Sequence, residues 1–182
     1  MANTESIEEL HKRLSGFSYG TIYGSFPHDY RSVEPAVFAR EKKGVCFDYV
    51  AYQADYFKKN YPGIKYELFY FETNFGEFCH TFMLYKKLGV YNIFEACMKP
   101  KEIISNPRYS PLMKTKIYQL LDIAKTHRGD TFLMRHRAPY VLYKYKAPQK
   151  YGMYIDTYME YIYHNGELIK DNDNYLKRVI GY

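Results

Sequence analysis

The sequence lacks features that several classes of protein require. It has no tryptophan, and its three cysteines in 182 residues are too few and too irregularly spaced for a disulfide framework. No apolar run reaches the roughly 18 residues of a membrane-spanning helix. The net charge of +6 is spread along the chain without a block of like charges, which favours a solvated surface over a stripe that binds nucleic acid. We therefore expect a protein that does not cross a membrane, and the charge pattern argues against nucleic acid as its main partner.

The N-terminal residues and the few cysteines bear on the cellular compartment. Residues 1–10 are polar and acidic and do not show the basic and then apolar order of a signal peptide. The reducing cytoplasm is therefore the expected location, and it keeps free thiols able to react. A protein exported by a dedicated secretion machine would show the same features.

The size and composition suit one globular domain over residues 1–182. Hydrophobic residues make up 47% of the chain and charged residues 25%, which is ordinary for such a domain. The 23 tyrosines and 12 phenylalanines are a less ordinary feature. Because tyrosine can cover a core while its hydroxyl stays in water, this richness needs no ligand to explain it, and we expect no cofactor.

Hydrophobic periodicity predicts a mixture of helices and strands. Helical spacing is found over 5–14, 45–60 and 110–126, with a helical turn at 35–40. Strand character is found over 64–71, 78–85, 90–96 and 131–145. Residues 152–164 fit either a strand or a helix, and the Asn165-Gly166 pair that follows, a favoured hairpin turn, favours a strand. The expected fold class is α+β.

Three residues indicate a chemical function. Cys46 lies in the segment KGVCFDY, at the expected first turn of the helix over 45–60. His80 lies in FCHTF and Glu95 in NIFEA, on two of the expected strands. A cysteine, a histidine and a carboxylate brought together are what a covalent amide-cleaving or acyl-transferring enzyme requires.

The two strands that carry His80 and Glu95 predict how these residues meet. If residues 86–89 form a four-residue loop, Tyr85 faces Val90, and His80 lies directly opposite Glu95. Side chains paired in this way have Cβ atoms about 4.5–5.5 Å apart, which allows an imidazole–carboxylate hydrogen bond. A slip of one residue would put the two side chains on opposite faces of the sheet.

The position of Cys46 suits a nucleophile. The positive end of the helix and an adjacent His80 imidazolium would both lower the pKa of its thiol, while Glu95 would orient the imidazole. Backbone N–H groups at the helix start point to where an oxyanion would form. A second oxyanion donor is expected from an upstream tyrosine hydroxyl, which the sequence leaves open among Tyr19, Tyr23 and Tyr30.

Together these segments resemble the core of the transglutaminase-like (papain-like) cysteine enzyme superfamily. The resemblance covers about residues 35–98 and is carried by Gly44 and Cys46 at the helix start, by His80 and by Glu95. It implies a transglutaminase-like/cysteine-proteinase core, in which a catalytic helix packs on an antiparallel β-sheet. It also implies Cys46 as the nucleophile, His80 as the general base and Glu95 as the orienting acid, without a metal or cofactor.

The sequence departs from the pattern of this superfamily at two points. Glu95 is one methylene longer than the usual aspartate, and the aromatic residues common near the histidine are represented only by Phe78 and Phe82. The resemblance implies a hydrolase or acyltransferase that cleaves amide or peptide bonds of a protein or peptide substrate through a thioester, with water as the expected acceptor of the acyl group. Protein deamidation and transglutamination are the alternatives within the superfamily.

Plainer interpretations of the same residues stay open. Cys79 and Cys97 are expected to pack in the core, Asp48 to cap the helix start, and His136 to lie at the surface. A zinc site of Cys79, His80 and Cys97 is a rival, although adjacent strand residues face opposite ways and no Cys-x-x-Cys motif is present. From another class of function, a non-catalytic module that binds a protein or nucleic acid through its tyrosine-rich surface also fits.

Overall fold

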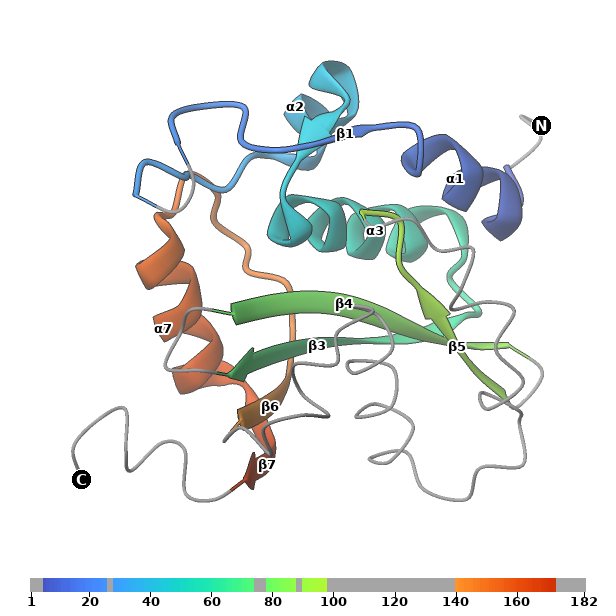
Figure 1. Cartoon of the computed structure of the whole chain (residues 1–182). Helices are drawn as coiled ribbons and strands as arrows, with labels where there is room; N and C mark the ends of the chain where they lie inside the picture. The colour runs from blue at the N-terminus through green and yellow to red at the C-terminus, as the bar shows by residue number, and fades with distance from the viewer. Residues whose placement is uncertain (1–4, 26–27, 74–77, 88–89, 98–139, 173–182) are drawn as a thin grey trace.

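A five-stranded antiparallel sheet forms the centre of the protein (Figure 1). The computed structural model describes residues 5–25, 28–73, 78–87, 90–97 and 140–172. The strand order is β5-β4-β3-β6-β7, with β3 (Lys65–Thr73), β4 (Phe78–Lys87), β5 (Val90–Phe94), β6 (Tyr140–Tyr145) and β7 (Glu167–Asn172). A short parallel pair, β1 (Ser18–Tyr19) and β2 (Lys43–Gly44), lies apart from this sheet.

The helices among the described residues form further layers over this sheet. They are α1 (Ile7–Leu14), α2 (Pro35–Glu41), α3 (Cys46–Asn60) and α7 (Ile155–Asn165). Helix α3 lies along one face of the sheet, α1 and α2 lie on the far side of α3, and α7 stands beside β6 (Figure 1). None of these helices combines the length and the apolar character needed to cross a bilayer.

The α+β fold class is confirmed, as are the helices predicted near the N-terminus and after Gly44. The predicted helical turn at 35–40 corresponds to α2. Strand β6 covers the last six residues of the strand predicted over 131–145. The rest of that strand, the helix predicted over 110–126 and His136 lie outside the described residues.

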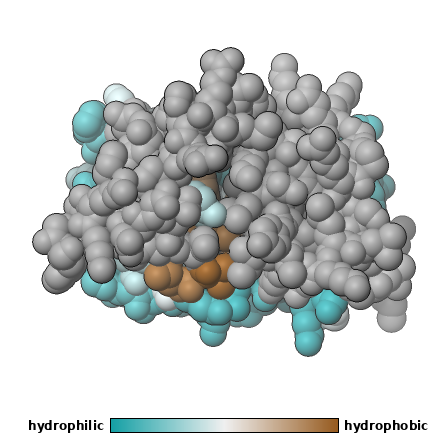
Figure 2. Space-filling view, turned by 60° about the horizontal axis from the view of Figure 1, so that its bottom comes forward, coloured by the Kyte–Doolittle hydropathy of each residue, from teal (hydrophilic) through white to brown (hydrophobic). Residues whose placement is uncertain are grey.

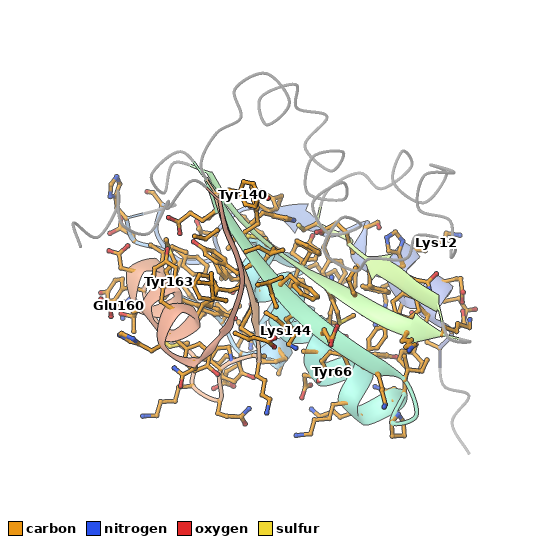
Figure 3. All side chains as sticks on the ribbon, turned by 90° about the horizontal axis from the view of Figure 1, so that it is seen from below. Lys12, Tyr66, Tyr140, Lys144, Glu160 and Tyr163 are labelled. Atoms are coloured by element: carbon orange, nitrogen blue, oxygen red, sulfur yellow. The ribbon has the colours of Figure 1, made fainter. Side chains whose placement is uncertain are left out.

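The strand favoured for residues 152–164 is wrong, because α7 occupies this stretch. Ile155, Tyr158 and Ile162 are buried at helical spacing. Figure 3 shows Tyr163 on the α7 side of the sheet, where its hydroxyl donates to the Glu72 carboxylate. Gly166 ends the helix instead of turning a hairpin, and a β-carbon there would lie 2.5 Å from the Ile162 carbonyl oxygen. Tertiary packing of one apolar helix face thus outweighs the local turn signal.

The two faces of the sheet are covered differently. The larger core lies between α3 and the sheet, and every residue from Cys46 to Ala54 is buried, because α3 is enclosed between the sheet and α1 and α2. A smaller aromatic and aliphatic cluster lies on the other face: Phe69, Phe71, Phe82, Leu84 and Leu142. Figure 2, in which the bottom of the molecule is turned forward, shows a small apolar patch below the centre of the view.

Gly44 is required by a close approach just before α3. A β-carbon at this position would lie 2.7 Å from two ring carbons of Phe38 and 2.9 Å from the Asp48 β-carbon. We expect Gly44→Ala to lower the free energy of unfolding by about 1–3 kcal/mol, the usual cost of overpacking. Urea unfolding measures this loss. Gly63→Ala is the matched control, because a β-carbon there meets no atom within 4 Å. Equal losses in both variants would contradict the packing argument.

Candidate functional site

Cys46 is the first residue of α3, and Asp48 holds the helix start in place. The Asp48 carboxylate accepts hydrogen bonds from the backbone N–H of Val45 at 3.0 Å, from that of Val33 at 3.1 Å and from the Tyr30 hydroxyl at 2.9 Å. It therefore satisfies one of the backbone donors that a helix N-terminus leaves unpaired, and it ties the incoming chain to the helix. The predicted capping role of Asp48 is confirmed.

The ionisation of Asp48 gives a prediction about stability and pH. Burial raises the pKa of Asp48 from 3.8 to about 6, against the opposing effect of its three hydrogen bonds. The pKa of Asp48 is higher in the folded state than in the unfolded state. Its contribution to the free energy of unfolding is therefore fully present at pH values below the unfolded-state pKa, and it is lost as the pH rises through about 6. A shift of this size corresponds to about 3 kcal/mol.

The quantity to compare is the difference in free energy of unfolding between the wild type and Asp48→Asn. We expect this difference to fall by up to about 3 kcal/mol between pH 3.8 and 6. Asparagine keeps the shape of the side chain but does not titrate. Urea unfolding of both proteins across this pH range measures the difference, which removes the contributions of all other carboxyl groups. A difference that is constant, or that grows with pH, would show that Asp48 does not ionise as stated.

His80, on β4, and Glu95, directly after β5, form a buried pair. The two residues are 5% and 3% exposed, and Nε2 of His80 lies 2.8 Å from Oε2 of Glu95. Oε1 of Glu95 accepts from the backbone N–H of Cys97 at 3.0 Å, and the Glu95 carbonyl oxygen lies 2.7 Å from Nε2 of His11. Because an ionised carboxylate only accepts hydrogen bonds, we assign the proton to Nε2 of His80, which leaves Nδ1 as the basic nitrogen.

The pairing of β4 with β5 differs from the predicted register. Lys87 faces Val90, so two residues rather than four join the strands, and the predicted pairing is wrong by two residues. A shift of two keeps each side chain on its own face of the sheet, because side chains alternate with a period of two. Glu95 therefore still reaches His80, although the two residues are not directly opposite.

The His80 side chain starts on the face of β4 that points away from α3. Met83 belongs to the core beneath α3, whereas Phe82 belongs to the cluster on the other face. Alternation along the strand therefore directs Thr81 toward α3 and His80 away from it. The His80 ring stacks on that of Phe82, with ring centroids 6.3 Å apart. Cys46, as part of α3, lies on the opposite side of the strand.

The Cys46 sulfur is nevertheless close to the backbone of β4. It interacts with the backbone N–H of Thr81, the residue after His80. The residue is 2% exposed, and burial raises the pKa of its thiol, an effect that the charge of Glu95 strengthens. The expected lowering of this pKa is therefore wrong: desolvation raises it and favours the protonated thiol.

The three tyrosines predicted as candidate oxyanion donors occupy different places. Tyr19 is 56% exposed, yet its hydroxyl end meets the thiol and the backbone N–H of Cys46, and burial of this hydroxyl raises the pKa of Tyr19. Tyr30 is buried and donates its hydroxyl to Asp48. Tyr23 is 54% exposed and lines a surface pocket. Of the three tyrosines, Tyr19 is thus the one whose hydroxyl is close enough to Cys46 to interact with its thiol.

Cys97 joins His80 and Glu95 in a cluster that the sequence analysis missed. A ring nitrogen, a carboxylate oxygen and the sulfur of these three residues all lie within 4.8 Å of one another. The predicted rival zinc site used Cys79, which instead packs against the core beneath α3. One feature of the sequence could have indicated Cys97: it follows Glu95 by two residues, and this spacing puts both side chains on one side of an extended segment.

The comparisons with known proteins identify no family for this chain. No protein-family model matches the chain, and no curated protein matches its sequence. What the described residues bring together is a helix-start thiol, a buried imidazole–carboxylate pair and a second thiol beside that pair.

Proposed function

We propose that this protein is a cysteine-dependent hydrolase or acyltransferase with a transglutaminase-like core, which cleaves amide or peptide bonds with Cys46 as its nucleophile. The observation that carries the proposal is the buried hydrogen bond of His80 to Glu95, which lies across β4 from the thiol at the start of α3. Since the Cys46 sulfur interacts with the N–H of Thr81, it is one residue away from the backbone of the proposed base. An oriented imidazole next to a thiol is the basis of covalent acyl transfer.

The reaction requires the His80 ring to turn toward Cys46. Strand β5 pairs with β4 from Met83 to Lys87, so the β5 edge of β4 is open at His80 among the strands that the structure describes. Rotation about the His80 side-chain bonds carries Nδ1 around this edge. Glu95, which bonds to the imidazole, is also close enough to Cys46 for its charge to act on the thiol.

In the proposed reaction, Nδ1 of His80 takes the thiol proton while the Cys46 sulfur attacks the carbonyl carbon. The carbonyl electron pair moves to oxygen, where the N–H of Cys46 and the hydroxyl of Tyr19 bind the negative charge. When the tetrahedral intermediate collapses, the C–N bond breaks and the amine leaves with the proton from His80. Water, deprotonated by His80, then attacks the thioester carbonyl, the C–S bond breaks to release the carboxylic acid, and the sulfur regains its proton from His80.

An activated ester tests the proposal without knowledge of the natural substrate. p-Nitrophenyl acetate needs little recognition, and it reports attack by a thiol as released nitrophenol. We expect a burst of nitrophenol followed by slower turnover, and we expect peptide mass mapping after acid quenching to find the acetyl group on Cys46. Cys79 and Cys97 are internal controls. Acetylation spread evenly over the three thiols, without a burst, would contradict the proposal.

A further inference from the structure

The Cys97 side chain lies beside the proposed catalytic pair of His80 and Glu95 and adds a third kind of ligand atom. A ring nitrogen of His80, a carboxylate oxygen of Glu95 and the sulfur of Cys97 lie within 4.8 Å of one another, and His80 and Glu95 are buried. Nitrogen, oxygen and sulfur donors in one place are the ligand set that Zn²⁺ accepts. We propose that His80, Glu95 and Cys97 form a Zn²⁺-binding site.

The distances require only a small adjustment. At zinc bond lengths, tetrahedral ligand atoms lie roughly 3.3–3.6 Å from one another. Nε2 of His80 and Oε2 of Glu95, now 2.8 Å apart, would separate slightly to admit the ion, and the Cys97 sulfur would move inward. The ion replaces the proton that these two atoms now share, and the Cys97 thiol releases its proton to solvent as its sulfur binds the metal. Three protein ligands leave a fourth position for a water molecule.

The surroundings of the cluster support a metal ion. The Tyr49 hydroxyl is buried and has no hydrogen-bond partner among the residues that the structure describes, and the Glu95 and Cys97 side chains are close enough to act on its ionisation. A water molecule on the metal would give this hydroxyl the partner that it lacks. The Cys97 N–H and the His11 ring hold Glu95 in place from outside the site, as supporting contacts do in metal centres.

A zinc ion here would also regulate the proposed reaction. With Nε2 bound to the metal, His80 loses its hydrogen bond to Glu95 and cannot turn toward Cys46. We therefore expect Zn²⁺ to inhibit acyl transfer. This consequence rests on the proposed function, whereas the binding of the metal does not.

Zinc binding to the full-length protein, measured in competition with a chromogenic chelator, tests the site. The proteins to compare are the wild type, Cys97→Ser, Cys79→Ser and Cys46→Ser. We expect Cys97→Ser to bind Zn²⁺ more weakly by more than the roughly 10- to 100-fold that loss of a supporting contact costs. Cys79→Ser and Cys46→Ser should bind as the wild type does. Circular dichroism of each variant shows whether it is folded.

The absorption spectrum of bound Co²⁺ distinguishes a thiolate site from weak binding of the metal to the protein surface. Co²⁺ bound by a thiolate shows a sulfur-to-metal charge-transfer band, which we expect in the wild type and in Cys79→Ser but not in Cys97→Ser. Wild-type affinity in a folded Cys97→Ser protein, or a charge-transfer band that survives this change, would overturn the site. Zinc binding that depends on Cys97 without acetylation of Cys46 would leave the metal site standing and refute the proposed enzyme.

Discussion

Replacement of Cys46 by serine is expected to abolish the burst of nitrophenol and to lower turnover of the activated ester by at least about 10³-fold. Serine has nearly the size of cysteine, but its hydroxyl is far harder to deprotonate, and His80 is then the base for a poor nucleophile. Stopped-flow absorbance measures the burst, and intact-mass spectrometry measures the acyl-enzyme.

The same variant is expected to fold normally. The Cys46 sulfur lies against the N–H of Thr81 and the Tyr19 hydroxyl, so a serine oxygen in its place finds polar partners. Cys79→Ser is the matched control, because Cys79 is a neighbour of the site that packs in the core beneath α3. A Cys46→Ser protein that keeps the burst, or a Cys79→Ser protein that loses it with an unchanged melting temperature, would remove Cys46 from the role of nucleophile.

The second large effect is expected from Glu95→Gln. Both oxygens of Glu95 now accept hydrogen bonds, from His80 and from the Cys97 N–H. An amide offers only one acceptor, so one of these buried donors loses its partner, or His80 changes tautomer. We expect a loss of about 10²- to 10⁴-fold in kcat, together with a changed pH–rate profile. The stability should fall by about 1–3 kcal/mol.

Glu72→Gln separates the catalytic effect from the loss of stability. Glu72 is also a buried carboxylate on the sheet, and it accepts hydrogen bonds from the Tyr70 and Tyr163 hydroxyls. We expect this variant to lose a comparable amount of stability and to keep its kcat. Similar losses of kcat in both variants would mean that Glu95 supports the fold alone and does not position His80.

Zinc binding and acyl transfer compete for one nitrogen in this scheme. Nε2 of His80 donates to Glu95 in the catalytic arrangement, and it would bind the metal in the inhibited one. A change at Cys97 therefore separates zinc binding from acyl transfer, because Cys97 belongs to the proposed metal site and takes no part in the proposed reaction. We therefore expect Zn²⁺ to suppress the esterase burst of the wild type. The burst of Cys97→Ser should be present both without and with added Zn²⁺.

Local patterns were sufficient for part of the site. The start of α3 at Cys46 follows from Gly44, the cap at Asp48 and the run without glycine or proline that follows. The meeting of His80 with Glu95 depends on strand alternation, and it survives a register error of two residues for that reason. The helix α7 could not be anticipated in this way, because its buried face is defined by β6 and by Glu72 on β3.

The amino-acid sequence by itself determined the fold class, the helix-start thiol and the imidazole–carboxylate pair, because each depends on spacing along one or two neighbouring elements. The tertiary structure decided how Cys46 ionises, on which side of β4 His80 starts, and that Cys97 rather than Cys79 stands beside the pair. These properties depend on desolvation and on contacts between segments far apart in the chain, which no local pattern encodes.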